Sequence, residues 1–503
     1  MTERLEEAVR GVGAVRSGEP VWPGAWVTSR LGVRLVDGDR PVGAGLASMV
    51  GLAVRRNPRR AHLLVSAVLG KHVPTDPRLV YGSGLLLGEL VRARLRDEAT
   101  SVPSGPLKDA LTGAPGAAAA LRDALREPRP PVDAIVLGYA ETATALGHSV
   151  ADALGGAYYL HSTRRPVPGF AAYGGFEEEH SHATSHLLLP SDPVALDRDV
   201  PLVLVDDELS TGQTVLNTIS TLHALRPRRH YVLAALVDLR GASDRARVDE
   251  LAARLGTRID AVSLAAGRVE LPDDVLERGT RIVSELSADS TPAGGAAASG
   301  GDAASGGDAA SGGDAASGGG AASSGGAAFG VARVRLDWPH GVPDGGRHGF
   351  LPDHRTALEK DLPRLADAVA AGLGDGASRV LVLGFEELMY APLRLAEALA
   401  DASPGLDVRY STTTRSPVLA VDDPGYAIRT RLAFPAHDDP ADGPGERYAY
   451  NVAPATGSPP FDRIVFVVDD VGDTQALASG LVARLRALAP VVVVTVPSHR
   501  GDK

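Results

Sequence analysis

Two kinds of hydrophobic pattern follow each other along much of the chain. Short, uninterrupted apolar runs are typical of parallel strands covered on both faces, whereas apolar residues three or four apart are typical of helices. The apolar runs lie at 134–137, 157–160, 203–205, 230–239 and 259–265. Helical spacing follows them at 145–154, 215–225 and 244–255. The alternation predicts an α/β core over 131–287, with a parallel sheet flanked by helices.

The first 130 residues are less regular and are predicted to form an N-terminal hood or substrate region. The alternation in 26–36 predicts a strand. A helix is predicted over 59–68, a second over 82–95, and an alanine-rich one within 103–131. The pattern over 44–56 fits a helix and an extended segment equally well.

A segment of low complexity separates this part from the rest of the chain. Residues 288–328 repeat the motif SGGDAA and hold almost no side chain to bury. A glycine- and serine-rich coil of this length spans about 35 Å root-mean-square and cannot hold a site. We therefore expect a flexible linker, with the parts on either side, including a C-terminal domain over 329–503, folding separately.

Composition narrows the class of protein. The chain has 503 residues, 44% of them hydrophobic, which suffices for several buried cores. Cysteine is absent, which excludes disulfides and thiolate zinc sites and fits a cytoplasmic protein. The formal net charge of −11 argues against broad binding of nucleic acid. No apolar run reaches 18 residues and the charged N-terminus lacks an apolar signal core, so no membrane span is expected.

Candidate chemistry concentrates after the apolar run at 203–205. Asp206 and Asp207 come at the carboxyl end of this predicted strand, where open α/β sheets bind ligands. Hydroxyls, a glycine and the first turn of a helix come next, and together they suit a phosphate. These residues are Ser210, Thr211, Gly212, Gln213 and Thr214. Two acids beside one phosphate cradle indicate a sugar phosphate; a merely capped helix start is the simpler alternative, which the order of motifs disfavours.

Two further loops carry candidate ligands. The stretch 138–144, GYAETAT, has small residues that let backbone N–H groups approach an anion. Within it, Glu141 could bind metal, catalyse, or only complement the start of a helix. Arg164 and Arg165 follow the run at 157–160, and paired guanidinium groups suit a pyrophosphate, although a solvated basic turn would look the same.

Other polar residues have open interpretations. Lys71 and His72 follow the helix predicted over 59–68 and either complement its dipole or lie over the ligand. The stretch 170–186 is rich in glutamate and histidine, which permits a metal site, although the histidine spacing is weakly diagnostic. The histidines concerned are His180, His182 and His186.

The layout of the first α/β unit recurs beyond the linker, at 379–500. RVLVLGFEEL echoes AIVLGYAET, and FDRIVFVVDDVGDT echoes VPLVLVDDELST. The acid pair persists as Asp469 and Asp470, but Asp473 and Gln475 stand where the first copy has a serine and its glycine. A carboxylate repels a phosphate, and loss of the glycine blocks close backbone approach. We expect a diverged duplicate that does not bind the same phosphate.

The stretch 203–214 is similar to the signature of type I phosphoribosyltransferases, which bind 5-phosphoribosyl-1-pyrophosphate (PRPP) there. The order of motifs over nearly the whole chain, apart from the linker, resembles the phosphoribosyltransferase encoded with tellurium-resistance (ter) stress operons in bacteria. The stretches concerned are NPRRAHLLVSAVLGKH, GYAETAT, EEEHSHATSH and VDDELSTGQT. The family's C-terminal TRSP domain is named for a motif that here reads Thr414-Arg415-Ser416-Pro417.

This resemblance implies a type I phosphoribosyltransferase fold and an enzyme that uses PRPP, an unknown base-like acceptor and Mg²⁺, in a stress-linked nucleotide-metabolite pathway. The catalytic candidates are Glu141, Arg164 and Arg165. The candidates for binding PRPP are Asp206, Asp207, Ser210, Thr211, Gly212, Gln213, Thr214, Ala140, Thr142, Ala143, Thr144 and Lys71. Asp206 and Asp207 would hold the metal indirectly, through ribose or water.

The alternative hypothesis is a PRPP-sensing or scaffold protein without turnover, the use that purine repressors make of this fold. No helix-turn-helix segment is evident near the N-terminus, and the acidic charge disfavours DNA. The resemblance implies that 138–144 holds pyrophosphate and that 170–186 is a mobile loop closing over PRPP, and both features favour chemistry. A homodimer and partners from the same stress operon are further expectations, whereas the acceptor has no readable code.

Overall fold

The structure is a computed structural model of the chain. It describes residues 21–57, 59–100, 105–177, 185–288, 328–437 and 445–499. Most of the predicted linker, together with His180 and His182, lies outside the described residues.

The first half is built on a six-stranded sheet in the order β1-β10-β9-β8-β4-β5. Five strands run parallel, and β1 at the edge runs antiparallel to β10. The strands are β1 (Arg34–Asp37), β4 (Ile135–Gly138), β5 (Tyr158–His161), β8 (Leu202–Leu209), β9 (His230–Asp238) and β10 (Arg258–Glu270). Strands β4 and β9 are buried along almost their whole length, as continuous apolar runs require when both faces are covered.

Helices cover both faces of this sheet. On one face, α4 (Pro77–Leu95) and α7 (Thr144–Leu154) share a core with alternate residues of the strands. On the other, α8 (Gln213–Leu225) and α9 (Ala242–Leu255) share a second core with the intervening strand residues. The predicted parallel sheet flanked by helices is confirmed.

The second half repeats this layout. Its five strands are all parallel, in the order β11-β17-β16-β12-β13. The last four match β9-β8-β4-β5 in position and in chain order, whereas β11 takes the position of β10 although it comes first in its half. Helices α11 and α12 join the core shared with the first half, and the helical segment 475–485 covers the opposite face. The bounds are β11 (Val331–Arg335), α11 (Pro352–Leu373), β12 (Arg379–Gly384), α12 (Tyr390–Ala402), β13 (Asp407–Thr412), β16 (Arg463–Asp469) and β17 (Val491–Val496). The predicted second α/β domain is confirmed.

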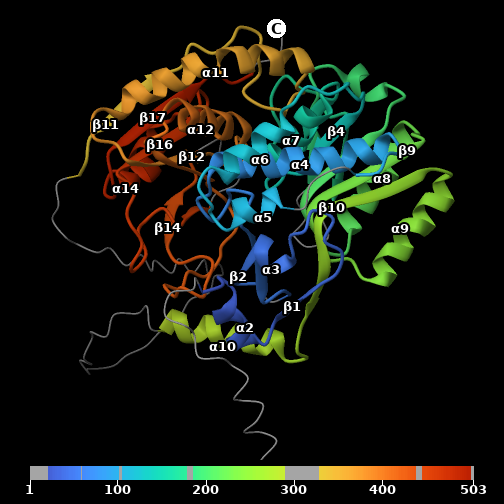
Figure 1. Cartoon of the computed structure of the whole chain (residues 1–503), viewed down its shortest axis with the longest axis horizontal. Coiled ribbons are helices and arrows are strands. Elements are labelled where there is room, and N and C mark those ends of the chain that lie inside the picture. The colour runs from blue at the N-terminus through green and yellow to red at the C-terminus, as the bar shows by residue number, and fades with distance from the viewer. Residues whose placement is uncertain are drawn as a thin grey trace, which may run out of the picture.

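The two halves share one hydrophobic core. Helix α12 packs against α4 and α7 between the two sheets (Figure 1). Asp152 of α7 is buried there and accepts hydrogen bonds from Tyr81 at 2.9 Å and Tyr390 at 2.6 Å. Arg394 of α12 pairs with Glu359 at 2.7 Å. Parting the halves would expose these groups, so the packing does not support the expectation, drawn from linker composition, that they fold separately.

The strand predicted over 26–36 is wrong in its first part. Helix α2 (Ala25–Leu31) forms there, because Val27 and Leu31, four residues apart, are buried on one side. Gly32 then ends the helix with φ +74°, and the short edge strand β1 follows. The strand therefore begins only after the glycine.

The helix predicted over 59–68 is wrong as well. Strand β3 (His62–Ser66) pairs there with β2 (Val50–Val54) in a largely buried hairpin, since packing outweighs local helix propensity. The alanine-rich stretch forms two short helices, α5 (Pro106–Leu111) and α6 (Ala117–Leu125), instead of one. Strand β1 joins the six-stranded sheet and α4 packs on its face, whereas β2 and β3 form a separate two-stranded sheet. This hairpin, with the turn that joins its strands, is called the hood.

The other elements lie at the edges of the two halves. They are α3 (Leu46–Met49), β6 (Gly174–Glu177), β7 (Ser185–Leu188), η1 (Pro193–Asp197), α10 (Val275–Ala288), β14 (Arg431–Pro435) and β15 (Glu446–Tyr450). The pairs β6–β7 and β14–β15 are antiparallel hairpins at matching positions of the two halves. In the part of the chain that the structure describes, no helix has both the length and the apolar character that crossing a membrane requires.

Candidate functional site

One cavity of about 400 Å³ gathers most of the predicted site residues. It lies where β4 and β8 end, so its floor is the carboxyl edge of the first sheet. Parts of the chain that are far apart in sequence form its walls. They are residues 139–142, residues 206–215, the motif 414–417 and several residues within 55–72.

The acid pair lies inside β8 rather than after it. Strand β8 pairs with β4 only as far as Val205 and continues beside β9 to Leu209. Asp206 and Asp207 therefore stand just beyond the end of β4, half-buried and lining the cavity. The hydroxyl of Thr142 donates to Oδ1 of Asp206 at 3.4 Å, which ties the acids to the neighbouring loop.

The predicted phosphate loop turns sharply from β8 into α8 and lines the cavity over its whole length. Gly212 makes the turn with φ +77°, and a Cβ there would lie 3.2 Å from Cδ of Arg240. Asp238 holds Arg240 in place through bonds of 2.8 and 2.9 Å. The positive end of the 13-residue helix α8 consequently meets the cavity, as an anion site requires.

The second predicted loop reaches the cavity only in part. Ala140, Glu141 and Thr142 line it, and the N–H of Ala140 donates to the Ser162 hydroxyl at 3.0 Å. Ala143 and Thr144 do not line it, although they are candidates for binding PRPP. They are buried at the start of α7, because the N–H of Ala143 closes the turn by bonding to Tyr139 at 2.8 Å.

Lys71 and Glu141 are buried charges in the cavity wall. Their side chains are 7% and 5% exposed, and Nζ of Lys71 lies 3.9 Å from Oε2 of Glu141. Burial lowers the pKa of Lys71, and the charges of Glu141 and Asp207 oppose that effect. An anion bound beside it would act in the same direction as these acids. Burial and the charges of Lys71 and Arg55 hold the pKa of His72 well below 6.5, so its ring is neutral.

The two predicted arginines point in different directions. Arg164 lines the cavity. The guanidinium of Arg165 instead lies 3.7 Å from Glu386 and over the ring of Phe385, both in the second half. Both residues lie in the bend that follows β5, where their side chains leave the backbone in different directions. A catalytic role for Arg165 at this cavity does not fit its position.

The TRSP motif reaches the cavity from the second half, which the sequence reasoning missed. Nε of Arg415 lies 2.9 Å from Oε1 of Glu141 and 2.7 Å from Oε2 of Glu386. Burial and the nearby charge of Glu141 raise the pKa of Glu386, and Arg415 counteracts this rise. Arg415 therefore joins the equivalent strand-to-helix loops of the two halves at one wall of the cavity.

The hood supplies arginines that the sequence reasoning also missed. Arg55, Arg56 and Arg60 line the cavity, and Arg60 pairs with Glu208 of β8 at 2.7 Å. The basic run RRNPRR is the available signal. Its position over the cavity depends on the hairpin β2–β3, which the hydrophobic periodicity does not predict.

Protein ligands for a metal are few in the ranges that the structure describes, where no group of three or more His, Asp or Glu side chains could hold an ion. His186 is buried, with Nδ1 2.9 Å from the hydroxyl of Ser162. Asp206 and Asp207 offer two adjacent carboxylates at the cavity. Such a pair fits Mg²⁺, which keeps several waters and takes other ligands from substrate phosphates.

The equivalent loop of the second half is occupied by its own side chains. Asp473 pairs with Arg333 at 2.6 and 2.8 Å. The hydroxyl of Thr474 caps the following helix by accepting from the N–H of Leu477 at 3.2 Å. Groups that would face a phosphate in the first half are thus engaged within the chain in the second.

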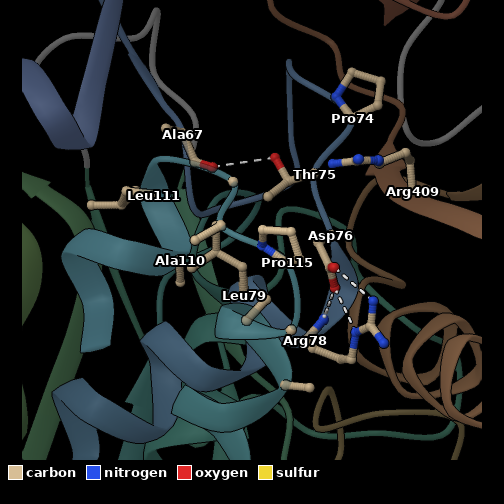
Figure 2. A pocket seen from close by; sticks show the side chains of 15 residues that line it. Ala67, Pro74, Thr75, Asp76, Arg78, Leu79, Ala110, Leu111, Pro115 and Arg409 are labelled. Carbon is tan, nitrogen blue, oxygen red and sulfur yellow. Dashed lines mark hydrogen bonds and ion pairs between the residues drawn. The ribbon is translucent and has the colours of Figure 1, made fainter. Parts of the chain in front are cut away.

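A second cavity, of about 320 Å³, shares no lining residue with the first (Figure 2). It lies between the start of α4 and the turn from α5 to α6. Its charged side chains are paired, Asp76 with Arg78 at 2.8 Å and Arg409 with Asp407 at 2.6 Å. The rest of its lining is mainly small and apolar, so the candidate chemistry belongs to the first cavity.

The chain is similar to several solved adenine phosphoribosyl transferases. The one from Trypanosoma brucei, in complex with AMP, pyrophosphate and ribose-5-phosphate, is 15% identical, with 30% of this chain and 66% of that chain covered and a TM-score of 0.22. The APRTase from Giardia lamblia, complexed with 9-deazaadenine, is 19% identical, with 31% and 82% covered and a TM-score of 0.22. Similarity this low carries no argument about substrate. No match was found among curated proteins.

Family models match both halves of the chain. Residues 49–268 match the model described as phosphoribosyl transferase, PRTase_2. Residues 344–485 match the model described as the TRSP domain, C-terminal to PRTase_2. The two matches include the acid pair, the phosphate loop and the TRSP motif, and the chain belongs to the phosphoribosyltransferases that carry a C-terminal TRSP domain.

Proposed function

We propose that this protein transfers ribose 5-phosphate from PRPP to a nitrogen nucleophile and releases pyrophosphate. One observation supports this most strongly. The acid pair, the phosphate loop and the loop 140–142 line a single cavity at the carboxyl edge of a parallel sheet. Each of the three has the chemistry that one part of PRPP needs.

In this proposal the 5-phosphate binds at the start of α8, where Ser210 and Thr214 add hydroxyls to the helix N–H groups. Asp206 and Asp207 accept hydrogen bonds from the ribose hydroxyls. Since the acids and the phosphate loop are separated by only two residues of β8, one sugar phosphate reaches both.

The pyrophosphate binds along residues 140–142, with Lys71 and Arg164 as its cationic partners. Lys71 is pre-positioned beside Glu141, at 3.9 Å. Mg²⁺, when bound near Asp206 and Asp207, would supply charge neutralisation for the leaving pyrophosphate. The hairpin β6–β7 carries the ends of the loop that is expected to close and exclude water.

In the reaction, a bond forms between the nucleophilic nitrogen and the anomeric carbon. The bond from that carbon to the pyrophosphate oxygen breaks, its electron pair leaves with pyrophosphate, and the proton on nitrogen passes to water. The transition state has oxocarbenium character, so catalysis consists mainly of positioning and charge stabilisation. Glu141, held by Lys71 and Arg415, is a carboxylate near the developing positive charge.

The test has two parts. Titration calorimetry with PRPP and Mg²⁺ measures binding, and a screen of bases and metabolite extracts measures pyrophosphate release. We expect binding together with acceptor-dependent release. Binding without release by any acceptor would favour the PRPP-sensing alternative, and the absence of binding would contradict both. A role in a stress-linked nucleotide-metabolite pathway in the cytoplasm is a further proposal, which the resemblance to the ter-operon family suggests.

A further inference from the structure

The cavity has a wall that PRPP does not explain. Once the phosphate loop, the acid pair and the pyrophosphate loop are assigned, the hood and the TRSP motif remain. On the proposed function this wall is where the second substrate enters, because the other walls hold parts of PRPP. The chemistry of its side chains therefore indicates which kind of acceptor binds there.

The remaining wall is one built surface and not two loose loops. Arg55, at the end of β2, pairs as an isolated antiparallel bridge with Val418, directly after the TRSP motif. The N–H of Leu419 donates to the carbonyl of Val54 at 3.1 Å. The hydroxyl of Tyr426 accepts from the N–H of Val54 at 2.7 Å. The hood and the second half thus hold each other in register at the cavity.

This wall is strongly cationic. The hood places Arg55, Arg56 and Arg60 on it, and Arg60 pairs with Glu208 at 2.7 Å. The field of these arginines also acts on buried neighbours. Burial and the charges of Arg60 and Arg55 lower the pKa of His62 from 6.5 to about 3.

The wall also offers little aromatic surface to a neutral base. Among the described residues that line the cavity, no phenylalanine or tryptophan occurs, Tyr139 belongs to the loop 138–144, and the rings of His72 and His186 are buried. Flat neutral rings are commonly held by aromatic faces, whereas arginine forks match carboxylate and phosphate oxygens. The chemistry of the wall favours an anion.

We propose, on the basis of the proposed function, that the acceptor is a nitrogen nucleophile that carries a carboxylate or a phosphate. Arg55 and Arg56 bind its anionic group, and the TRSP loop, fixed by Arg415, forms the adjoining part of the same wall. The transfer step is unchanged, with the proton on nitrogen passing to water. The second half of the chain thereby determines which acceptor the first half accepts.

The experiment compares matched probes on the full chain, saturated with Mg²⁺, pyrophosphate and ribose 5-phosphate so that the phosphate positions of PRPP are filled. The pairs are orotate with uracil and nicotinate with nicotinamide for a carboxylate, and 4-aminophenyl phosphate with 4-aminophenol for a phosphate. Calorimetry should show at least one anionic member binding about tenfold or more tightly than its neutral partner, the effect of one charge-assisted hydrogen bond. The pair that discriminates identifies the anionic group.

Variants assign the effect to the wall. Arg56→Gln, at an exposed residue, should weaken the preferred anion about tenfold while the affinity for PRPP stays within about twofold. Arg254→Gln, at an exposed position on α9, is the matched control and should change neither affinity. Neutral probes binding as tightly as anionic ones, no anionic probe binding, or an unchanged affinity in the Arg56 variant would each overturn the proposal. PRPP is titrated first, so that a failure to bind PRPP, which would contradict the proposed function, is distinguished from a failure to prefer anionic acceptors.

Discussion

The two α/β halves share the order of four strands and an acid pair within or directly after the third of them in chain order, but their loops after that pair differ in what they contact. In the first half, Gly212 opens the turn and the start of α8 meets a cavity. In the second, Gln475 stands at the position of this glycine, and Asp473, at the position of Ser210, pairs with Arg333. The comparison shows that a duplicated fold keeps its layout through the hydrophobic core, whereas the site depends on a few loop residues.

The second half still contributes side chains to the cavity of the first half. Its Arg415 holds Glu141 of the first half at 2.9 Å, and in return Thr163 of the first half donates to Glu387 of the second at 2.9 Å. In each half, the segment that follows the edge strand, β5 or β13, therefore contacts the loop that follows β12 or β4 of the other half. The second half packs against the first as a subunit would, and its TRSP motif forms part of the cavity lining.

The largest expected effect concerns the union of the halves. Arg394 is 1% exposed, pairs with the buried Glu397 of its own half at 2.7 Å and lies 3.7 Å from the buried Asp152 of the first half. Arg394→Ala should lower the free energy of unfolding by about 3–5 kcal/mol, because buried carboxylates lose their partner. Calorimetry of the full chain should show one transition that moves as a whole. Arg364→Ala, at an exposed arginine on α11, should leave the midpoint of this unfolding transition unchanged. Two separate unfolding transitions would contradict the shared core.

The acid pairs offer the most direct comparison. Asp206→Asn with Asp207→Asn should weaken PRPP binding about 100-fold or more, since two charge-assisted hydrogen bonds to the ribose are lost. The same change at Asp469 and Asp470 should have no effect, because these acids bond within their own half. Calorimetric titration of both double variants measures the difference. Equal losses would mean that the second half binds PRPP after all.

Substitution of the glycine in the phosphate loop should affect both stability and PRPP binding, whereas the same change at a glycine elsewhere should affect stability alone. Gly212 and Gly256 both have positive φ, +77° and +63°, but a Cβ added to Gly256, which ends α9, would have no atom within 4 Å. An alanine at either position should cost about 1–2 kcal/mol of stability for the left-handed backbone. Only Gly212→Ala should also weaken PRPP binding, by about tenfold, because its Cβ approaches Arg240. Urea unfolding and PRPP titration of both variants provide the test, and weakened binding in the Gly256 variant would point to a general loss of structure.

The smallest expected effect is a sensitivity to acid that the halves share. Burial lowers the pKa of His348 from 6.5 to about 3, and this residue follows Arg347 as His72 follows Lys71. Below pH 6.5 the unfolded chain takes up a proton that the folded chain excludes, so stability is full above that pH and falls as the pH is lowered towards 3. Between pH 7 and 5.5, the free energy of unfolding of His348→Gln should therefore fall by about 1 kcal/mol less than that of the parent. Unfolding midpoints at both pH values test this, with the exposed His340→Gln as control; equal losses in the parent and the His348 variant would contradict it.

Local pattern was enough to predict the central parts of the first sheet. The runs at 134–137, 203–205 and 230–239 are strands because fully buried parallel strands must be apolar on both faces. The acid pair and phosphate loop could be located for the same reason, since they follow directly on such a strand. Segment 59–68 could not be predicted, because its pairing with β2 is what makes it a strand.

The sequence by itself determined the α/β class, the duplication and the adjacency of Asp206, Asp207 and the loop 210–214, because these depend on residues close together in the chain. Only the tertiary structure decided that Arg415 and the hood arginines share a cavity with them, and that Arg165 turns away. Arg415 lies about two hundred residues beyond the acid pair along the chain, and no local period encodes a contact of that separation. The shared core between the sheets brings the segments together, and burial of apolar surface at that core supplies the free energy that holds them there.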